Sequence, residues 1–455
     1  MAKKSFLLLL AFLSFTIVSA QNKLPVIKAT STKVDIRDGE NFKKGSWNLT
    51  PNAKPDVYNT LASKNKKITF YTDMDSISFT VKANKTYDFL IVLNNKDTCW
   101  TRIDVKKEIP ATNFTKSYIK EHEGKYNFEI PEVQELVHII IALTPQGIES
   151  PYLVNKDTEY FKKVMEHFGS FKNEKIVSDI NAILKDGAYS HIKMDACGFY
   201  FKGNKIVKSK TYDRLNWSNK NYVEPLVKEL QDFSEKTNFR AFFQANKPYY
   251  DALITLINQQ IPIQKQWDWL ERNFNNHYNN YWLTFSPLVN GSHSANMFES
   301  GNFKQAAMFI AGPMENSTYN EKITEGLMTR MVFTEIDHNY VNPVSDKYLS
   351  EIDKAFANRD TWTKAKSGAD NYSTPYLIFN EYMTWAVFTL YTSDNFNADD
   401  FKIINENVEK RMIERRGFTN FKSFNEKVFE LYKNKAKNTT IADIYPAILQ
   451  WSSEQ

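Results

Sequence analysis

The chain has 455 residues, of which 42% are hydrophobic and 24% charged, and its formal net charge is +5. This composition is ordinary for a globular protein of several domains and excludes a disordered or collagen-like chain. Two cysteines exclude a disulfide framework and a zinc-finger array. Because the basic residues do not gather into a dense cluster, we expect no nucleic-acid partner.

The first 20 residues have the pattern of a secretory signal peptide. Lys3 and Lys4 precede the apolar run Phe6–Val18, and small residues allow cleavage near Ala20-Gln21. The run is shorter than the roughly 20 residues that a transmembrane helix needs, and the sequence turns polar directly after it. An N-terminal membrane anchor is the alternative interpretation. We therefore expect a periplasmic or secreted protein that does not span a membrane.

Residues 21–147 carry the alternating pattern of β-strands. Apolar residues alternate with polar ones at 77–81, and the apolar run 89–93 is followed by turn-forming residues at 94–97. We also expect a buried strand at 136–143. Catalytic residue types do not cluster here, so we expect an accessory β-sandwich-like module. A separate hypothesis gives this module a glycan- or protein-binding role.

After residue 147 the spacing of apolar residues becomes helical. Strands are predicted at 281–288 and 306–311. Helices are predicted at 158–167, 175–184, 222–233, 249–258, 263–275, 321–339, 375–392, 406–415, 423–434 and 441–451. The predicted fold class is therefore α+β, with a signal peptide (1–20), a β-rich module (21–147) and a mainly helical domain with a small sheet (148–455). An exported protein also allows a disulfide between Cys99 and Cys197, which their spacing does not decide.

The segment 331–338, MVFTEIDH, carries the most informative pattern. On a helix, Thr334 and His338 lie one turn apart on one face, and Glu335 lies beside them. That face also carries apolar residues, so we expect it to point into the protein. Buried polar groups without partners cost about 1–3 kcal/mol each, so a metal ion or a second polar helix is expected opposite.

The segment 376–391, YLIFNEYMTWAVFTLY, is apolar on almost every side and holds one ionisable carboxylate, Glu381. A buried carboxylate becomes neutral or finds a cation. Facing Glu335 and His338 across a helix pair, it would have the geometry that one-metal hydrolases use. The alternatives are a structural carboxylate bonded to Trp385, a tyrosine or the backbone, and a metal-free Glu335/His338 pair.

The motif Thr334–His338 resembles the metallopeptidase motif HExxH with threonine in place of the first histidine. Asn380-Glu381 resembles the Asn-Glu that supplies the third ligand in gluzincins. The strands predicted before the motif resemble a substrate-binding edge. Over roughly residues 150–450 the chain is similar to an uncharacterised, exported bacterial family of zincin-like (gluzincin-type metallopeptidase-like) proteins.

The resemblance implies that Glu335 is the general base, and that His338 and Glu381 hold zinc or another divalent metal together with position 334. Thr334 departs from the family pattern, because a neutral hydroxyl binds zinc less well than an imidazole nitrogen. Three alternatives would complete the metal site. Thr334 binds the metal through its oxygen or through a water molecule, Glu335 becomes a ligand, or His293 moves in to become one.

Two functions follow from the motif and from the threonine that replaces its first histidine. The first is an exported metal-dependent hydrolase whose substrate is a peptide or protein segment lying along the edge strand. The second is a metal-free pseudopeptidase whose cleft binds a peptide or protein partner. The oligomeric state is left open by the sequence.

Overall fold

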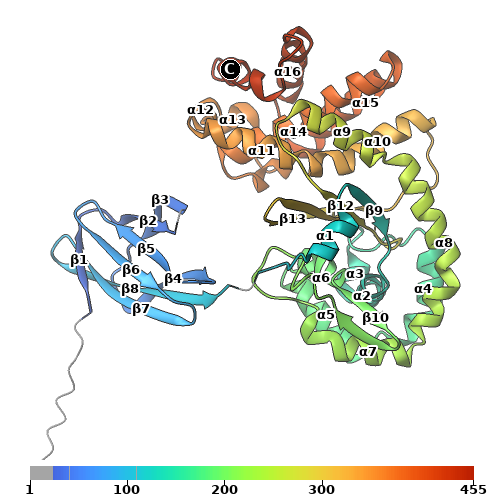
Figure 1. Cartoon of the computed structure of the whole chain (residues 1–455), viewed down its shortest axis with the longest axis horizontal. Coiled ribbons are helices and arrows are strands. Elements are labelled where there is room, and N and C mark those ends of the chain that lie inside the picture. The colour runs from blue at the N-terminus through green and yellow to red at the C-terminus, as the bar shows by residue number, and fades with distance from the viewer. Residues whose placement is uncertain (1–23, 40, 109, 290) are drawn as a thin grey trace, which may run out of the picture. The chain divides into compact units, whose positions relative to one another are not determined.

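The computed structural model describes residues 24–39, 41–108, 110–289 and 291–455. The predicted signal peptide lies outside these residues. The chain forms two compact units, which divide between residues 109 and 110. The fold class is α+β as predicted, with a strand-rich first unit and a mainly helical second unit (Figure 1).

The first unit is a β-sandwich of two four-stranded sheets, ordered β1-β7-β8-β4 and β3-β2-β5-β6. Alternate residues of both sheets, such as Ile36, Phe70 and Phe89, share one core. The strands predicted at 77–81 and 89–93 are confirmed. The bounds are β1 (Val26–Ala29), β2 (Lys33–Asp38), β3 (Asn41–Asn48), β4 (Asn52–Ala62), β5 (Lys66–Tyr71), β6 (Ser76–Val81), β7 (Lys85–Leu93) and β8 (Asp97–Lys107).

The second unit contains a four-stranded sheet in the order β13-β14-β12-β9, so β13 forms one edge of it. Its strands are β9 (Lys125–Glu129), β12 (Asn280–Thr284), β13 (Ser294–Ser300) and β14 (Phe303–Phe309). β12 and β14 confirm the two predicted strands with shifted ends, but both lie inside the sheet, so neither is the substrate-binding edge that the resemblance implied. Because β9 pairs in parallel with β12, the preceding chain from residue 110 belongs to this unit. The structure thus divides the chain at 109/110 instead of the predicted 147.

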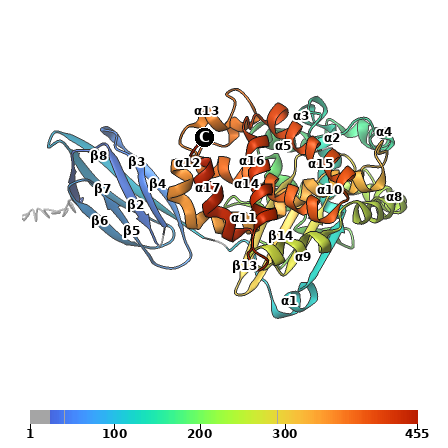
Figure 2. The same ribbon diagram turned by 90° about the horizontal axis from the view of Figure 1, so that it is seen from above.

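Helices cover the sheet from two sides. In Figure 1, α2–α7 gather on one side and α10–α17 on the other, and α8 runs past both; Figure 2 shows the same helices from above. The bounds are α1 (Lys116–His122), α2 (Glu132–Leu143), α3 (Pro145–Glu149), α4 (Glu159–Phe168), α5 (Lys175–Lys185), α6 (Tyr189–Ala196), α7 (Val227–Lys236), α8 (Phe239–Gln260), α9 (Ile263–Asn273), α10 (Glu321–Ile336), α11 (His338–Ser345), α12 (Leu349–Ala355), α13 (Arg359–Trp362), α14 (Pro375–Asn395), α15 (Ala398–Lys410), α16 (Phe421–Asn434) and α17 (Tyr445–Ser452). A hairpin of β10 (Phe199–Lys202) and β11 (Lys205–Lys208) and a π-helical turn at Arg411–Arg416 complete the unit.

One sequence prediction in this unit is wrong. The segment 136–143, predicted as a strand, lies within helix α2. Residues 133–143 are all buried, so the helix is apolar around its whole circumference and shows no 3.6-residue period. A short apolar run of this kind does not distinguish a buried strand from a buried helix, and only the packing around it decides.

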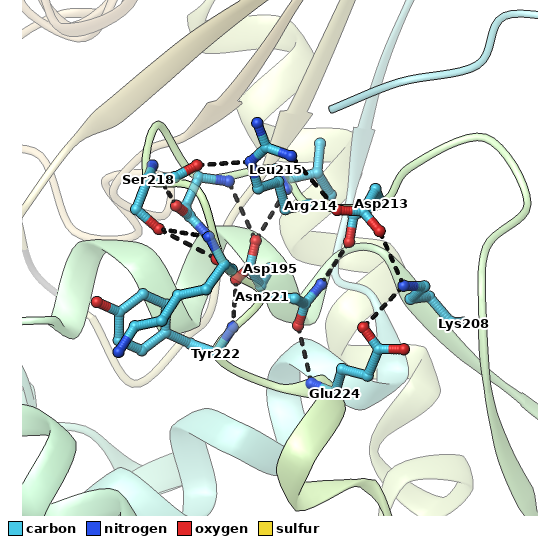
Figure 3. A network of polar contacts seen from close by, with 11 residues as sticks. Asp195, Lys208, Asp213, Arg214, Leu215, Ser218, Asn221, Tyr222 and Glu224 are labelled. Carbon is cyan, nitrogen blue, oxygen red and sulfur yellow. Dashed lines mark hydrogen bonds and ion pairs between the residues drawn. The ribbon is translucent and has the colours of Figure 1, made fainter. Parts of the chain in front are cut away.

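A buried carboxylate holds the long loop after β11 in place. Asp195, in α6, accepts hydrogen bonds from the backbone N–H groups of Leu215, Asn216 and Tyr222 at 2.8, 3.1 and 2.7 Å (Figure 3). Three donors on one carboxylate satisfy loop amides that would otherwise be buried without partners. Asp195 therefore has a structural role.

Two further features concern the cysteines and the length of the apolar helices. Cys99 and Cys197 are both free thiols. Across the described parts of the chain, no helix combines the length and the apolar character needed to cross a bilayer.

Candidate functional site

A cavity of about 780 Å³ in the second unit brings together the residues that the sequence singled out. Thr334 and Glu335 reach it from α10, His338 from the start of α11, and Glu381 from α14. His293 reaches it from the segment just before β13. Four of these five residues lie on helices that pack against one another, so the predicted convergence of the motif helix and the Glu381 helix is present in the structure.

The motif crosses a junction between two helices. α10 ends at Ile336, and Asp337 keeps right-handed helical angles of −70° and −19° before α11 begins at His338. The chain therefore continues helically, and His338 stays about one turn beyond Thr334. Asp337 is fully buried, and neither oxygen of its carboxylate has a hydrogen-bond partner among the described residues. Burial and the nearby Glu381 and Glu335 raise its pKa well above the usual value, which favours a neutral Asp337.

The hydroxyl of Thr334 is engaged within its own helix. Its Oγ1 donates to the backbone carbonyl of Arg330 at 2.9 Å. This bond is common for threonine inside helices and leaves the hydroxyl proton directed at the backbone. Glu335, by contrast, has no hydrogen-bond or ion-pair partner in the described structure, and burial raises the pKa of its carboxyl.

Glu381 is only 5% exposed and lies among polar side chains. Its Oε1 accepts from Trp385 Nε1 at 2.8 Å and lies 2.5 Å from Nη1 of Arg416. Its Oε2 lies 3.9 Å from Nε2 of His338. The alternative of a structural carboxylate bonded to Trp385 is thus present, and the cation that a buried Glu381 requires is the guanidinium of Arg416.

These side chains do not fit a bound divalent metal. The Thr334 hydroxyl donates to a carbonyl, and one Glu381 oxygen is already held by Arg416 and Trp385. In the described residues, no three His, Cys, Asp or Glu side chains are grouped as a metal site requires. A guanidinium beside the carboxylate also repels a second cation.

Four arginines line the same cavity: Arg330 from α10, and Arg411, Arg415 and Arg416 from the π-helical turn. None of the four was predicted from the sequence, and the last three lie more than 70 residues from the motif. The only local signal is the recurrence of arginine at 411, 415 and 416. The four cations share the cavity with two carboxylates, Glu335 and Glu381, so its lining is positive on balance.

The two histidines of the cavity are anchored differently. Nδ1 of His293 accepts from the backbone N–H of Ala311 at 3.3 Å, and burial together with nearby cations lowers its pKa to about 4. His293 is therefore neutral at physiological pH. Nδ1 of His338 lies 3.3 Å from Oδ1 of Asn342, which orients the ring with Nε2 toward Glu381.

Comparison with known proteins gives one match. The profile of a family described as "Domain of unknown function (DUF4932)" matches residues 146–451, which include every residue of the cavity named above. No curated protein and no solved structure matches the chain.

Proposed function

The chain belongs to the family described as a domain of unknown function, DUF4932, and we propose that it is a metal-free, exported peptide-binding protein. In this proposal the cavity is that of a zincin-like peptidase whose catalytic ion has been replaced by an arginine. The observation that carries it is the 2.5 Å contact between Arg416 Nη1 and Glu381 Oε1.

The charge balance around Glu381 supports the proposal. A buried carboxylate is stable in its ionised form only beside a positive partner. Arg416 provides that charge, and its guanidinium also packs over the rings of Trp385 and Tyr372 at 4.9 and 5.5 Å. A metal ion would have to displace a guanidinium that is held by an ion pair and by stacking at once.

The position of the cavity supports a peptide as the ligand. Residues 291–293, which line the cavity, lead directly into β13, the edge strand of the sheet. An edge strand offers backbone hydrogen bonds to an extended peptide, and an adjoining cavity accepts one of its side chains or its end. Tyr152, Tyr372 and Tyr376 add aromatic surface to the lining.

A second function has one specific observation in its favour. Nε2 of His338 lies 3.9 Å from Oε2 of Glu381, and Glu335 opens into the same cavity with a raised pKa. This is the arrangement expected of a metal-dependent peptide-bond hydrolase with Glu335 as the general base and His338 and Glu381 as ligands. It requires that Arg416 release Glu381.

Metal analysis of the natively purified full-length protein separates the two functions. We expect no stoichiometric metal by mass spectrometry and no heat of binding when zinc or manganese is added. Thr334→His combined with Arg416→Gln should bind zinc at least tenfold more tightly than Thr334→His alone, because the competing guanidinium is gone. Arg102→Gln is the control, since Arg102 forms an ion pair with Asp88 in the first unit, away from the cavity. Stoichiometric metal that is lost in Glu381→Ala would overturn the proposal in favour of the hydrolase.

A further inference from the structure

The cavity holds positive charge that no side chain in the described structure neutralises. Arg416 is paired with Glu381, whereas Arg330, Arg411 and Arg415 have neither an ion pair nor a hydrogen bond there. The Nε atom of Arg330 is buried without an acceptor, and its guanidinium is stacked over the Trp385 ring at 5.1 Å. A guanidinium with a buried nitrogen that has no acceptor is rare because leaving water is costly for a charge, so a site that keeps one is suited to an external anion.

The local backbone directs these arginines to one side. Residues 411–416 form a π-helical turn, a feature that often marks functional sites. At roughly 100° per residue an α-helix would place Arg416 roughly 140° away from Arg411. The wider π-helical turn, at roughly 80° per residue, places Arg415 and Arg416 each within roughly 40° of Arg411, one on either side of it. All three side chains can therefore line the same cavity as Arg330.

Mutual repulsion shows how closely the cations gather. Burial, followed by the charges of Arg411, Arg416 and Arg415, lowers the pKa of Arg330 to about 9. Burial, followed by the charges of Arg415 and Arg416, lowers the pKa of Arg411. A bound anion would relieve this repulsion, because it interacts favourably with each guanidinium at once.

The cavity is better suited to an organic acid than to a free inorganic ion. Its volume of about 780 Å³ lies in the range of sites for organic ligands, and tyrosines and Leu377 contribute apolar lining. Guanidinium groups match a carboxylate through two parallel hydrogen bonds. The two acidic side chains that share the lining, Glu335 and Glu381, limit the number of anionic groups that fit together.

We propose that the cavity binds a carboxylate-bearing peptide, whose carboxylate is held by Arg330 together with Arg411 and Arg415. This rests on the peptide-binding function proposed above and specifies its ligand. The carboxylate belongs either to an Asp or Glu side chain of the peptide or to its C-terminus. The chemistry is the same in both cases, and the extended remainder of the peptide lies along β13.

Four matched, fluorescein-labelled hexapeptides test this on the full-length protein. They combine a Glu or Gln residue at the fifth position with a free or amidated C-terminus, and binding is measured by fluorescence anisotropy. We expect at least one peptide with a carboxylate to bind at least tenfold more tightly than the uncharged Gln amide. The pair that shows the difference identifies the side chain or the terminus as the source. Arg330→Gln should abolish this preference, and Arg102→Gln should leave it unchanged.

Other outcomes overturn the proposal. Equal binding of all four peptides refutes the carboxylate preference and leaves peptide binding intact. Binding of none refutes peptide binding, and the preference with it. Tighter binding of a phosphoserine version, or full competition by inorganic phosphate, assigns the cavity to phosphate instead. Should Arg330→Gln fail to fold, Arg415→Gln serves as the second variant, because Arg415 is exposed and has neither an ion pair nor a side-chain hydrogen bond in the described structure.

Discussion

Helices α2 and α14 each place a buried glutamate near a histidine, but the glutamate has a different role in each. Both are almost wholly buried, and each holds a buried glutamate with a histidine nearby. In α2 these are Glu135 and His138. In α14 the glutamate is Glu381, and His338 faces it from α11. The difference lies in the side chains packed opposite each helix.

Around Glu135 the hydrogen-bond partners are neutral. Tyr160 donates to Oε1 of Glu135 at 2.8 Å, and its hydroxyl lies 2.6 Å from that of Tyr250. Without a cation to offset burial, the pKa of Glu135 rises to about 7. Burial likewise lowers the pKa of His138 to about 3, so both groups favour their neutral forms.

Around α14 the partners are charged and a cavity is present. Arg416 pairs with Glu381, and further arginines line the space beyond. The facing side chains, and not the helix's own sequence, therefore decide whether a buried carboxylate is part of a neutral core or of a charged cavity.

The largest effect on stability is expected for Glu381→Ala. It leaves Arg416 and Trp385 without their partner, and removing one member of a buried ion pair costs about 3–5 kcal/mol. Urea unfolding should show a loss of this order. Glu381→Gln is the control, since it keeps an acceptor for Trp385 and should lose less. A loss below about 1 kcal/mol would mean that Arg416 does not neutralise Glu381 in solution.

Glu135→Gln, by contrast, is expected to stabilise the protein at high pH. The folded-state pKa of Glu135 is raised from 4.5 to about 7, so its ionisation destabilises the fold progressively between these values and fully above them. At pH 8 the variant should be more stable than the parent by on the order of 3 kcal/mol, and at pH 4 the two should be equal. Urea unfolding across this range gives the difference, in which groups common to both proteins, such as His138, cancel. An equal gain at both pH values would show that packing, not charge, is responsible.

The smallest effect on stability is expected for Gly417→Ala, which follows the π-helical turn Arg411–Arg416. Gly417 ends this turn with φ of +83°, and an added Cβ would meet the side chain of Ser367. Gly417→Ala should therefore cost about 1–2 kcal/mol for the left-handed conformation, with a further loss from the contact. Gly203→Ala is matched, because Gly203 has φ of +60° and open space around its Cβ position. Equal losses in urea unfolding would show that Ser367 simply moves aside.

Local periodicity was enough to predict several features. Alternation of apolar residues identified β6 and β7, and helical spacing together with burial identified α10 and α14. The same reasoning placed Glu335, His338 and Glu381 at one site, because a polar group on an apolar helix face requires a partner.

The identity of that partner, Arg416, depends on how the helices pack. Arg416 lies 35 residues beyond Glu381, and no spacing rule connects them. The helical state of α2 and the pairing of β9 with β12, which sets the boundary of the unit, likewise depend on distant chain segments. Periodicity reports which face of an element is buried, whereas the group that meets that face is determined by how the elements pack.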